Sequence, residues 1–315
     1  MSESSAKEIF MIKIKKAPIR FESDEDKRAF VGECEKDFEK RLVDTVNEIN
    51  NVGDIKIIAL SGPTCSGKTT AARRIISELG ARGKRVNVIS IDDFYYDKDF
   101  LHKRSAAMGT DTIDYDSADT IDIEALREFV DKISEGGELI CPVFDFHSGR
   151  RSSERRIVCG EEDIFIFEGI QAIYHEITPL FDAHGYLSVH IAPHSALDVG
   201  GAIFEPNEIR LLRRLVRDSN FRSTSAEFTF KIWDSVRKNE EKNIFPYTDS
   251  CLFHIDSTFA YEMGVLKPYL TKILSDMSAD SQYRDMADAI LDKISVTEEI
   301  STDNLSANSL YWEFV

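Results

Sequence analysis

Positive charge is scarce in this sequence. Its 315 residues include 39 lysines and arginines against 56 aspartates and glutamates, which gives a formal net charge of −17. An acidic chain offers no broad basic surface to displace counterions from nucleic acid, so we expect no nucleic-acid partner. We interpret the acidity mainly as a contribution to solubility.

Cysteines and long apolar runs are also few. The five cysteines stand at positions 34, 65, 141, 159 and 251 without CxxC spacing, which is typical of reduced thiols and argues against a disulfide framework or a zinc site. No apolar run approaches the roughly 20 residues of a membrane span. The first ten residues, MSESSAKEIF, lack the basic-then-apolar layout of a signal peptide. We therefore expect a cytoplasmic protein with no membrane partner.

The sequence contains no internal repeat and no Pro/Gly/Ser-rich linker. A 3.6-residue apolar period predicts an amphipathic helix over 24–50, and a helix should run from Gly67 to about Leu79, capped by Gly80. Short apolar runs predict strands in DIKIIALSG, RVNVISI, ELICPVF, DIFIFEG, YLSVHIA and CLFHIDS. Their alternation with helical segments favours a single doubly wound α/β domain, with a parallel sheet flanked by helices. A last helix, in YRDMADAILDKI, should pack on the outside of the sheet.

The stretch SGPTCSGKTT, residues 61–70, has the G-x-x-x-x-G-K-T spacing of a phosphate-holding loop. Its glycines let the backbone wrap around phosphate oxygens, and the following helix adds its partly positive N-terminus. Lys68 is expected to reach the terminal phosphates of a nucleotide, and Thr69 to offer its hydroxyl to Mg²⁺. The candidate nucleotide-binding residues are Gly62, Pro63, Thr64, Cys65, Ser66, Gly67, Lys68, Thr69 and Thr70. A base-reading N-K-x-D motif is absent, which lowers, without excluding, a GTPase switch.

Acidic residues follow two of the predicted strands. Asp92 comes just past a strand end, where open parallel sheets bind ligands, so it is a candidate base for an attacking hydroxyl. We expect Asp93 only to cap a turn. Glu168 ends another apolar strand and resembles a Mg²⁺-supporting carboxylate, although an ordinary strand-end glutamate fits the pattern equally well. In the acidic stretch DTIDYDSADTID, Asp119 and Asp122 are read as part of a solvated loop.

Arginines gather on one predicted helix. In EIRLLRRLVRDSNFRS the first four fall at i, i+3, i+4 and i+7, and the full set is Arg210, Arg213, Arg214, Arg217 and Arg222. Arginines stabilise charge on a transferring phosphoryl group, which is one interpretation of the cluster. The alternative is a salt-bridged surface helix that uses nearby acids such as Glu208 and Asp218.

Together these segments resemble the uridine kinase and phosphoribulokinase family, most of all a bacterial uridine-kinase-like branch in which a similar kinase part can follow a TGS-bearing region. The similar segments are GPTCSGKT, DDFYY, DYDSADTID, PVFDF, FEGI, RRLVRDSNFR, WDSVRKNEEKNIFP, VLKPYL and ISTDNLSANSLYWEF. The resemblance spans roughly residues 25 to 315. It rests on the order and number of the segments, because only the phosphate loop is specific by itself.

The resemblance implies an ATP-dependent kinase, with ATP and Mg²⁺ as cofactors, that phosphorylates a nucleoside or similar small alcohol. By position, three acids match the family's catalytic base, ribose-holding acid and Mg²⁺-side acid, namely Asp92, Asp116 and Glu168. Three arginines match those of a lid that approaches the phosphates, namely Arg214, Arg217 and Arg222. The fold implied is a P-loop NTPase-type sheet with an arginine-bearing lid helix.

The sequence departs from the family at three positions. Phe144 stands where uridine kinases carry tyrosine, Gly149 where they carry a base-reading histidine, and Thr224 where a lid arginine is usual. Reading of a pyrimidine base is therefore left open. His147 is either a substitute contact or an ordinary loop histidine, and Arg150 would suit an acidic or phosphorylated acceptor.

We thus predict a small-molecule kinase that transfers the γ-phosphate to a hydroxyl, with a nucleoside as the leading acceptor. The alternatives are a kinase of a sugar phosphate or hydroxy acid, and a nucleotide-binding regulator without transferase activity. Catalysis is assigned to Asp92, Lys68 and Arg217, further nucleotide contacts to Arg214 and Arg222, acceptor contacts to Asp116, Phe144, His147 and Arg150, and Mg²⁺ to Thr69 and Glu168. The expected divisions are an N-terminal extension over 1–23, a kinase domain over 24–275 and a C-terminal helical tail over 276–315. A homo-oligomer is left open.

Overall fold

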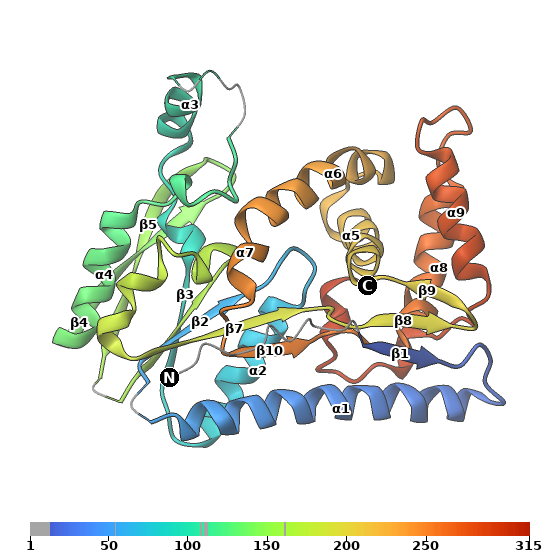
Figure 1. Ribbon diagram of the computed structural model, residues 1–315, viewed down its shortest axis with the longest axis horizontal. Helices are drawn as coiled ribbons and strands as arrows, with labels where there is room; N and C mark the ends of the chain where they lie inside the picture. Colours follow the sequence, from blue (N-terminus) through green and yellow to red (C-terminus); the bar gives the residue numbers. More distant parts are fainter. Residues whose placement is uncertain (1–12, 54, 108, 110–112, 161) are drawn as a thin grey trace, which may run out of the picture.

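The computed structural model describes residues 13–315 except 54, 108, 110–112 and 161, and its centre is a five-stranded parallel sheet (Figure 1). The strands, in spatial order, are β10 (Phe253–Asp256), β7 (Tyr186–Ala192), β2 (Ile57–Ser61), β6 (Ile164–Glu168) and β3 (Val86–Ser90). Every neighbouring pair is parallel. The predicted doubly wound α/β architecture is confirmed.

Both faces of this sheet are buried. Along β2, Ile58 and Leu60 enter one hydrophobic core while Ile57 and Ala59 enter the other, because successive side chains of a strand point to opposite faces. The first core is covered by α1 (Asp24–Asn51), α2 (Lys68–Ala81), α5 (Pro206–Arg222), α8 (Glu262–Ser275) and α9 (Arg284–Ser295). The second is covered by α4 (Ile123–Glu135), the hairpin of β4 (Gly137–Asp145) and β5 (Arg150–Cys159), and short 3₁₀ segments. The remaining helices are α3 (Lys98–Ala107), α6 (Ala226–Asn243) and α7 (Phe245–Thr248).

The helix predicted over 24–50 is α1, and it lies beneath both sheets in the view of Figure 1. Ser23 caps it by accepting a hydrogen bond from the backbone N–H of Asp26, and three acids in its first turn favour the positive end of the helix dipole. Its buried positions follow the predicted period, at Val31, Phe38, Leu42, Val46 and Ile49.

A second, three-stranded sheet was not predicted. It consists of β1 (Ile14–Ala17), β8 (Ala196–Val199) and β9 (Ala202–Phe204), with β1 parallel to β8 and β8 antiparallel to β9. The strands are too short and too mixed in polarity to give an apolar run. β1 lies within the predicted N-terminal extension, whose first twelve residues lie outside the described part of the chain. Lys15 of β1 forms an ion pair with Asp256 at 2.8 Å, which joins this sheet to β10.

Two local predictions differ from the structure. Helix α2 continues past Gly80 to Ala81, and its chain reversal uses Gly83, which has a φ of 81°. The segment ELICPVF does not join the central sheet. Within the described chain it pairs only with β5, whose charged sequence RRSSERRIVC has no apolar run to reveal a strand.

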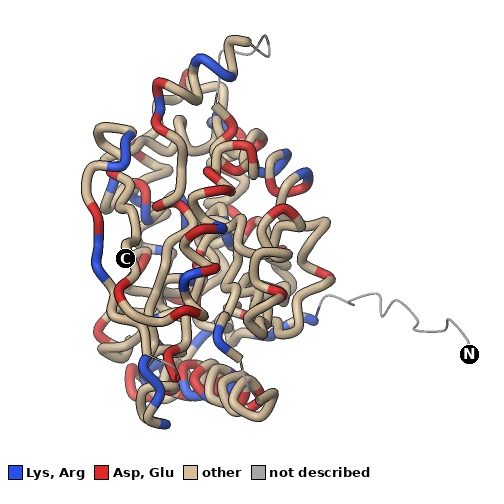
Figure 2. The backbone as a smooth tube through the Cα atoms, turned by 90° about the vertical axis from the view of Figure 1, so that its left-hand side faces the viewer, with Lys and Arg blue, Asp and Glu red and all other residues tan. Residues whose placement is uncertain are grey.

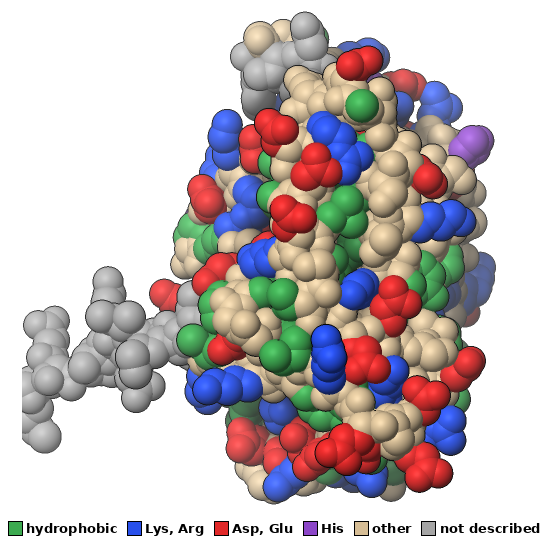
Figure 3. Space-filling model, turned by 90° about the vertical axis from the view of Figure 1, so that its right-hand side faces the viewer, with side chains coloured by type: hydrophobic (Ala, Val, Ile, Leu, Met, Phe, Trp, Pro, Cys, Tyr) green, Lys and Arg blue, Asp and Glu red, His purple; other side chains and the backbone are tan. Residues whose placement is uncertain are grey.

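Charged side chains of both signs alternate over the molecule. Figure 2 shows basic and acidic positions interspersed along the chain, and the face in Figure 3 carries them in the same mixture, with hydrophobic side chains in small groups. None of the helices formed by described residues is long and apolar enough to cross a membrane.

The C-terminal segment folds back onto the first core. Helix α9 packs against α8, and its Ala287, Ile290 and Ile294 belong to the first core. After α9 the chain returns to the phosphate loop, where Tyr311 is fully buried and its hydroxyl donates to the Glu262 carboxylate. Glu262 is in turn paired with the buried Arg213, so this tail completes a buried polar network.

We expect Tyr311→Phe to destabilise the protein by about 1–3 kcal/mol, because one hydrogen bond to a buried carboxylate is lost with no water to replace it. Urea unfolding measures the change. Tyr269→Phe, on the half-buried part of α8, is the matched control. Equal stabilities for the two variants would show that the Tyr311 hydroxyl contributes nothing.

Candidate active site

A cavity of about 930 Å³ opens at the carboxyl ends of β3 and β6, between the phosphate loop and helices α5 and α6. Parallel sheets present ligand sites at this edge, because the strand ends and the helix N-termini face it together. The loop and strand ends contribute Thr64, Cys65, Ser66, Gly67, Lys68, Thr69, Asp92, Tyr95, Glu168, Gly169 and Ile170. The other wall contributes Ile113, Tyr115, Asp116, Arg214, Arg217, Arg222, Phe228, Ile232, Val236, Asn239, Glu240, Ile244 and Glu313.

The phosphate loop has the backbone that its glycines predict. Gly67 has a φ of 93°, and a side chain there would also meet Leu310 at 2.3 Å. Gly62 has no room for a Cβ, because the carbonyl oxygen of Ile191 on β7 lies 2.2 Å from its position. Cys65 adopts the left-handed region without being glycine, with a φ of 58°. Such a conformation costs free energy and persists only where the surroundings hold it.

Lys68 points inward over its own loop. Its Nζ donates to the backbone carbonyl of Gly62 at 2.7 Å, and burial lowers the pKa of its ammonium against the opposing attraction of Glu168 and Asp92. The hydroxyl of Ser66 is buried and has no hydrogen-bond partner in the described part of the chain. These groups, with the N-terminus of α2, form a cradle for an oxyanion.

The arginine stripe divides into two groups. Arg210 and Arg213 are 1% and 0% exposed, and they pair with the buried Glu240 and Glu262. Each also holds the loop from behind, since Arg210 Nε donates to the Thr64 carbonyl at 3.0 Å and an Arg213 N–H donates to that of Cys65 at 3.3 Å. These two arginines therefore shape the loop and do not face the cavity. The alternative of a surface helix is wrong for them.

The remaining arginines, Arg214, Arg217 and Arg222, surround a single carboxylate. Asp218 is 2% exposed and accepts from Arg214 Nε at 3.1 Å and from Arg217 at 2.7 Å, while Arg222 lies 3.7 Å away. The Glu313 carboxylate also acts on Arg217, so three positive charges meet two negative ones. The excess faces the cavity beside the phosphate loop, where an anionic ligand would offset it. Arg217 also donates to the Thr64 hydroxyl at 3.4 Å.

The two adjacent aspartates after β3 point in different directions, but Asp93 contacts another strand instead of only capping a turn as predicted. Asp92 lines the cavity, and burial, together with the nearby Glu168, raises the pKa of its carboxyl to about 6. Asp93 turns away and accepts a hydrogen bond from the backbone N–H of Phe144 at 3.0 Å, which fastens β4 to this strand end. The 3₁₀ turn Ile91–Phe94 produces this divergence.

Thr69, Asp92 and Glu168 all line this cavity, and the Glu168 carboxylate is near enough to act on that of Asp92. A hydroxyl and carboxylates are the hard donors that suit Mg²⁺, which keeps several waters and binds through few protein groups. The residues present therefore fit a Mg²⁺ ion carried by nucleotide phosphates.

The cavity wall around Asp116 combines carboxylate with apolar surface. Asp116 lies there beneath the side chains of α6, and burial, with the neighbouring Asp114, raises the pKa of its carboxyl. Asn239 of α6 hydrogen-bonds with this acidic pair, at 3.2 Å for its bond to Asp114. The apolar wall is made by Ile113, Tyr115, Ile232 and Val236.

The three candidate residues of the β4–β5 hairpin lie elsewhere. Phe144 is buried and packs edge-on against Tyr95, so it backs a cavity residue without lining the cavity. His147 is exposed in a turn held by Asp145. Arg150 is paired with Asp99 of α3 at 2.7 Å.

The family model for the "Phosphoribulokinase / Uridine kinase family" matches residues 57–258, which is well over half of the chain. The chain belongs to this family. Its members are phosphotransferases that act on an alcohol, and the sequence resemblance is thereby confirmed.

Individual members of the family are only distantly similar to the chain. A uridine kinase of Ureaplasma parvum serovar 3 is 27% identical over 180 residues, covering 57% of this chain and 77% of that protein. A uridine kinase of Schizosaccharomyces pombe is 29% identical over 199 residues, covering 62% of this chain and 39% of that protein. Among solved structures, a phosphoribulokinase from Rhodobacter spheroides is 14% identical with a TM-score of 0.43, and covers 77% of this chain and 98% of its own.

Three cavity residues of this family member escaped the sequence analysis. Tyr95 donates from its hydroxyl to the Tyr115 carbonyl at 2.9 Å and so joins two cavity walls. Asn239 lies in WDSVRKNEEKNIFP, a segment that resembled the family without a residue being assigned. Glu313 accepts a hydrogen bond from the backbone N–H of Thr70 at 2.6 Å, and so caps α2 from the far end of the chain. No local pattern marks such a long-range cap.

We expect Asp92→Asn to stabilise the ligand-free protein at pH 7 by about 1–3 kcal/mol, because an ionised carboxylate is held in a buried site against its preference. The folded-state pKa is raised above the unfolded one, so protonation relieves this cost as the pH falls. The advantage of the variant should therefore shrink below pH 6 and nearly vanish by about pH 4.

Urea unfolding at several pH values, without metal or nucleotide, measures this difference. Asp131→Asn on the exposed side of α4 is the control and should match the wild type throughout. A stability difference that stays constant between pH 7 and pH 4 would contradict a raised pKa at Asp92.

Proposed function

We propose that this protein is an ATP-dependent kinase that transfers the γ-phosphate to a hydroxyl of a ribose-bearing nucleoside. The loop cradle and the arginines around Asp218 support binding of a polyphosphate. Lys68 would leave its own loop carbonyls for the terminal phosphates, and Arg214, Arg217 and Arg222 would approach the same oxygens from α5. Mg²⁺, held by Thr69 and Glu168 directly or through water, would supply further charge neutralisation on the phosphates.

Asp92 is proposed as the base. It lines the cavity within electrostatic reach of Lys68, and a carboxyl with a pKa of about 6 is ionised at neutral pH yet more basic than a solvated one. It would accept the proton of the acceptor hydroxyl while that oxygen forms its bond to phosphorus and the bond to ADP breaks. Alignment of the hydroxyl by the same carboxylate precedes this step.

The charge of the acceptor end favours a nucleoside, and this observation carries the proposal. Asp92 and Asp116 face it, while the lysines and arginines that line the cavity within the described chain come only from the phosphate loop and α5. A sugar phosphate or hydroxy acid would bring negative charge toward these carboxylates. An uncharged nucleoside can donate hydrogen bonds from two ribose hydroxyls to Asp116 and place its flat base against the apolar wall.

Arg150 was the residue that suited an acidic acceptor, and its pairing with Asp99 gives that alternative no support at the cavity. Phe144 and His147 lie on the β4–β5 hairpin and do not line the cavity, so any effect on the acceptor would be indirect. Phe144 would act by backing Tyr95. His147 would need to move toward the cavity.

The acceptor class is tested by measuring ADP release with nucleosides, sugar phosphates and hydroxy acids, with the product mass determined. A nucleoside monophosphate is expected. Phosphorylation of only a sugar phosphate or hydroxy acid would contradict the nucleoside proposal. ATP binding without transfer to any acceptor would instead favour a nucleotide-binding regulator.

Asp92→Asn should lower kcat by at least about 100-fold while ATP affinity is nearly kept, because the amide cannot accept the proton. Asp93→Asn is the matched control. Its side-chain carbonyl can still accept from the Phe144 N–H, so its kcat should stay near that of the wild type. The reverse pattern would place the base one residue later than proposed.

Asp116→Ala should raise the KM for a ribonucleoside by about 10- to 100-fold with little change in the KM for ATP, because charge-assisted hydrogen bonds to ribose are lost. A 2′-deoxynucleoside should lose affinity with the wild type but little more with the variant. Asp119→Ala, in the same acidic stretch, is the control. If the change from ribonucleoside to deoxynucleoside raises KM equally in the wild type and the variant, Asp116 does not bind the ribose.

A further inference from the structure

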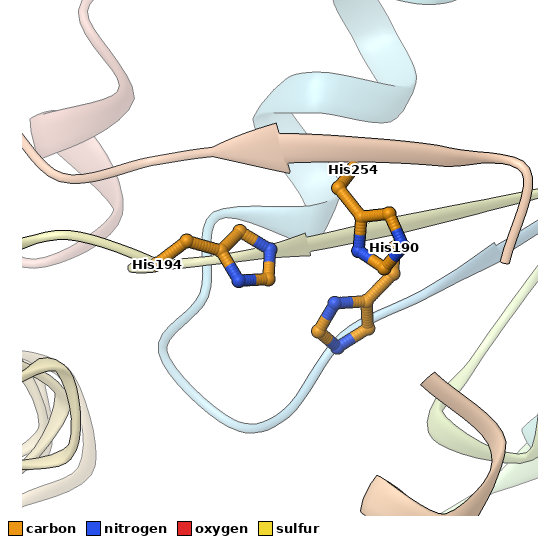
Figure 4. Close-up of side chains that lie close together, drawn as sticks. All are labelled: His190, His194 and His254. Carbon is orange, nitrogen blue, oxygen red and sulfur yellow. The ribbon is translucent and has the colours of Figure 1, made fainter. Parts of the chain in front are cut away.

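Three of the seven histidines converge outside the active-site cavity (Figure 4). His190 on β7 and His254 on β10 are register partners in the central sheet, and His194 follows the end of β7. One ring nitrogen from each lies within 4.8 Å of the others. They come from the same sheet edge as the phosphate loop but line a separate cavity of about 670 Å³.

The ring of His190 is unusual because neither of its nitrogens has a hydrogen-bond partner among the described residues, while the residue is only 3% exposed. A buried polar group without a partner is costly, so such groups normally have a role or an unseen ligand. Nε2 of His194 is also buried without a partner. Both rings contact each other edge-on, at 5.2 Å between centroids.

The third ring is already oriented by the backbone. His254 hydrogen-bonds with the main chain of Cys251, which is the type of contact that fixes the tautomer of a metal-bound histidine.

We propose that His190, His194 and His254 bind a transition-metal ion of the zinc class. Three imidazoles suit Zn²⁺ or Co²⁺ and do not suit Mg²⁺, which prefers oxygen. Nitrogens on one tetrahedral zinc lie about 3.3 Å apart, so modest rotation of the side chains closes the site. The cavity beside the rings leaves the fourth position for water or an anion.

The charges around the histidines permit this site. Lys15 lies near His194, but its ammonium is neutralised by Asp256 at 2.8 Å. Arg210 lies near His190, and its guanidinium is paired with Glu240. The positive charge of Lys68 also repels a charge on His190, although the Lys68 Nζ donates its hydrogen bond to the carbonyl of Gly62. Pro63 of the phosphate loop lines the same cavity, so metal binding would brace the outer side of that loop.

The test uses the full chain without a histidine tag, freed of metal by chelation. Titration with Co²⁺ should give one equivalent bound and the visible absorption of a four-coordinate nitrogen site, and Zn²⁺ should displace it. The melting temperature should rise with either metal, because the ion binds only the folded arrangement. Mg²⁺ should have neither effect.

His194→Gln and His254→Gln should each weaken Co²⁺ binding at least about tenfold. Both positions are only half-buried, so the variants are expected to fold, which circular dichroism checks. His102→Gln, exposed on α3, is the control and should bind as the wild type does. Undiminished binding in both site variants, a sulfur-to-cobalt charge-transfer band, or no binding by the wild type would overturn the proposal.

Discussion

Two buried arginines hold the phosphate loop in place, and the active site depends on this support. Arg210 and Arg213 donate to the carbonyls of Thr64 and Cys65, directly before the loop's left-handed turn at Gly67. Pairing with Glu240 and Glu262 lets two charged groups remain inside the core. Such ion pairs add little net stability. Removing one partner is nevertheless costly, because the other charge is then left unpaired and shielded from water. The loop's shape is therefore tied to the integrity of the core.

Helix α5 both supports the phosphate loop and faces the cavity, because its 3.6-residue period turns successive arginines to different sides. Arg210 and Arg213 turn toward the core, whereas Arg214 and Arg217 are rotated onto the cavity wall and share Asp218. The C-terminal tail adds a second connection, since Tyr311 meets the Arg213 pair while Glu313 caps α2. Residues more than 240 positions apart thus meet at one helix N-terminus.

The sheet and the loop were predictable because both are local signals. Continuous apolar runs reveal strands that are buried on two faces, and the glycine spacing reveals the loop. The strand-end position of Asp92, and the opposite direction of Asp93, follow from the same reasoning. The hairpin strand β5 and the short sheet with β1 were missed because exposed, charged strands have no apolar run. Glu313 and the division of the arginine stripe were unpredictable, since each depends on partners distant in the chain.

The charge distribution of the cavity links the fold to the choice of acceptor. The lysine and arginines that line the cavity in the described part of the chain come from the loop and α5, whereas Asp116 lies against α6. We therefore expect a ligand pair that is anionic toward the loop and neutral toward Asp116. Raising the pKa of Asp92 by burial costs stability when the cavity is empty. A carboxylate that is stabilised less by its surroundings takes up a proton more readily. Burial of Asp92 therefore lowers the stability of the ligand-free protein and at the same time favours proton transfer from an alcohol.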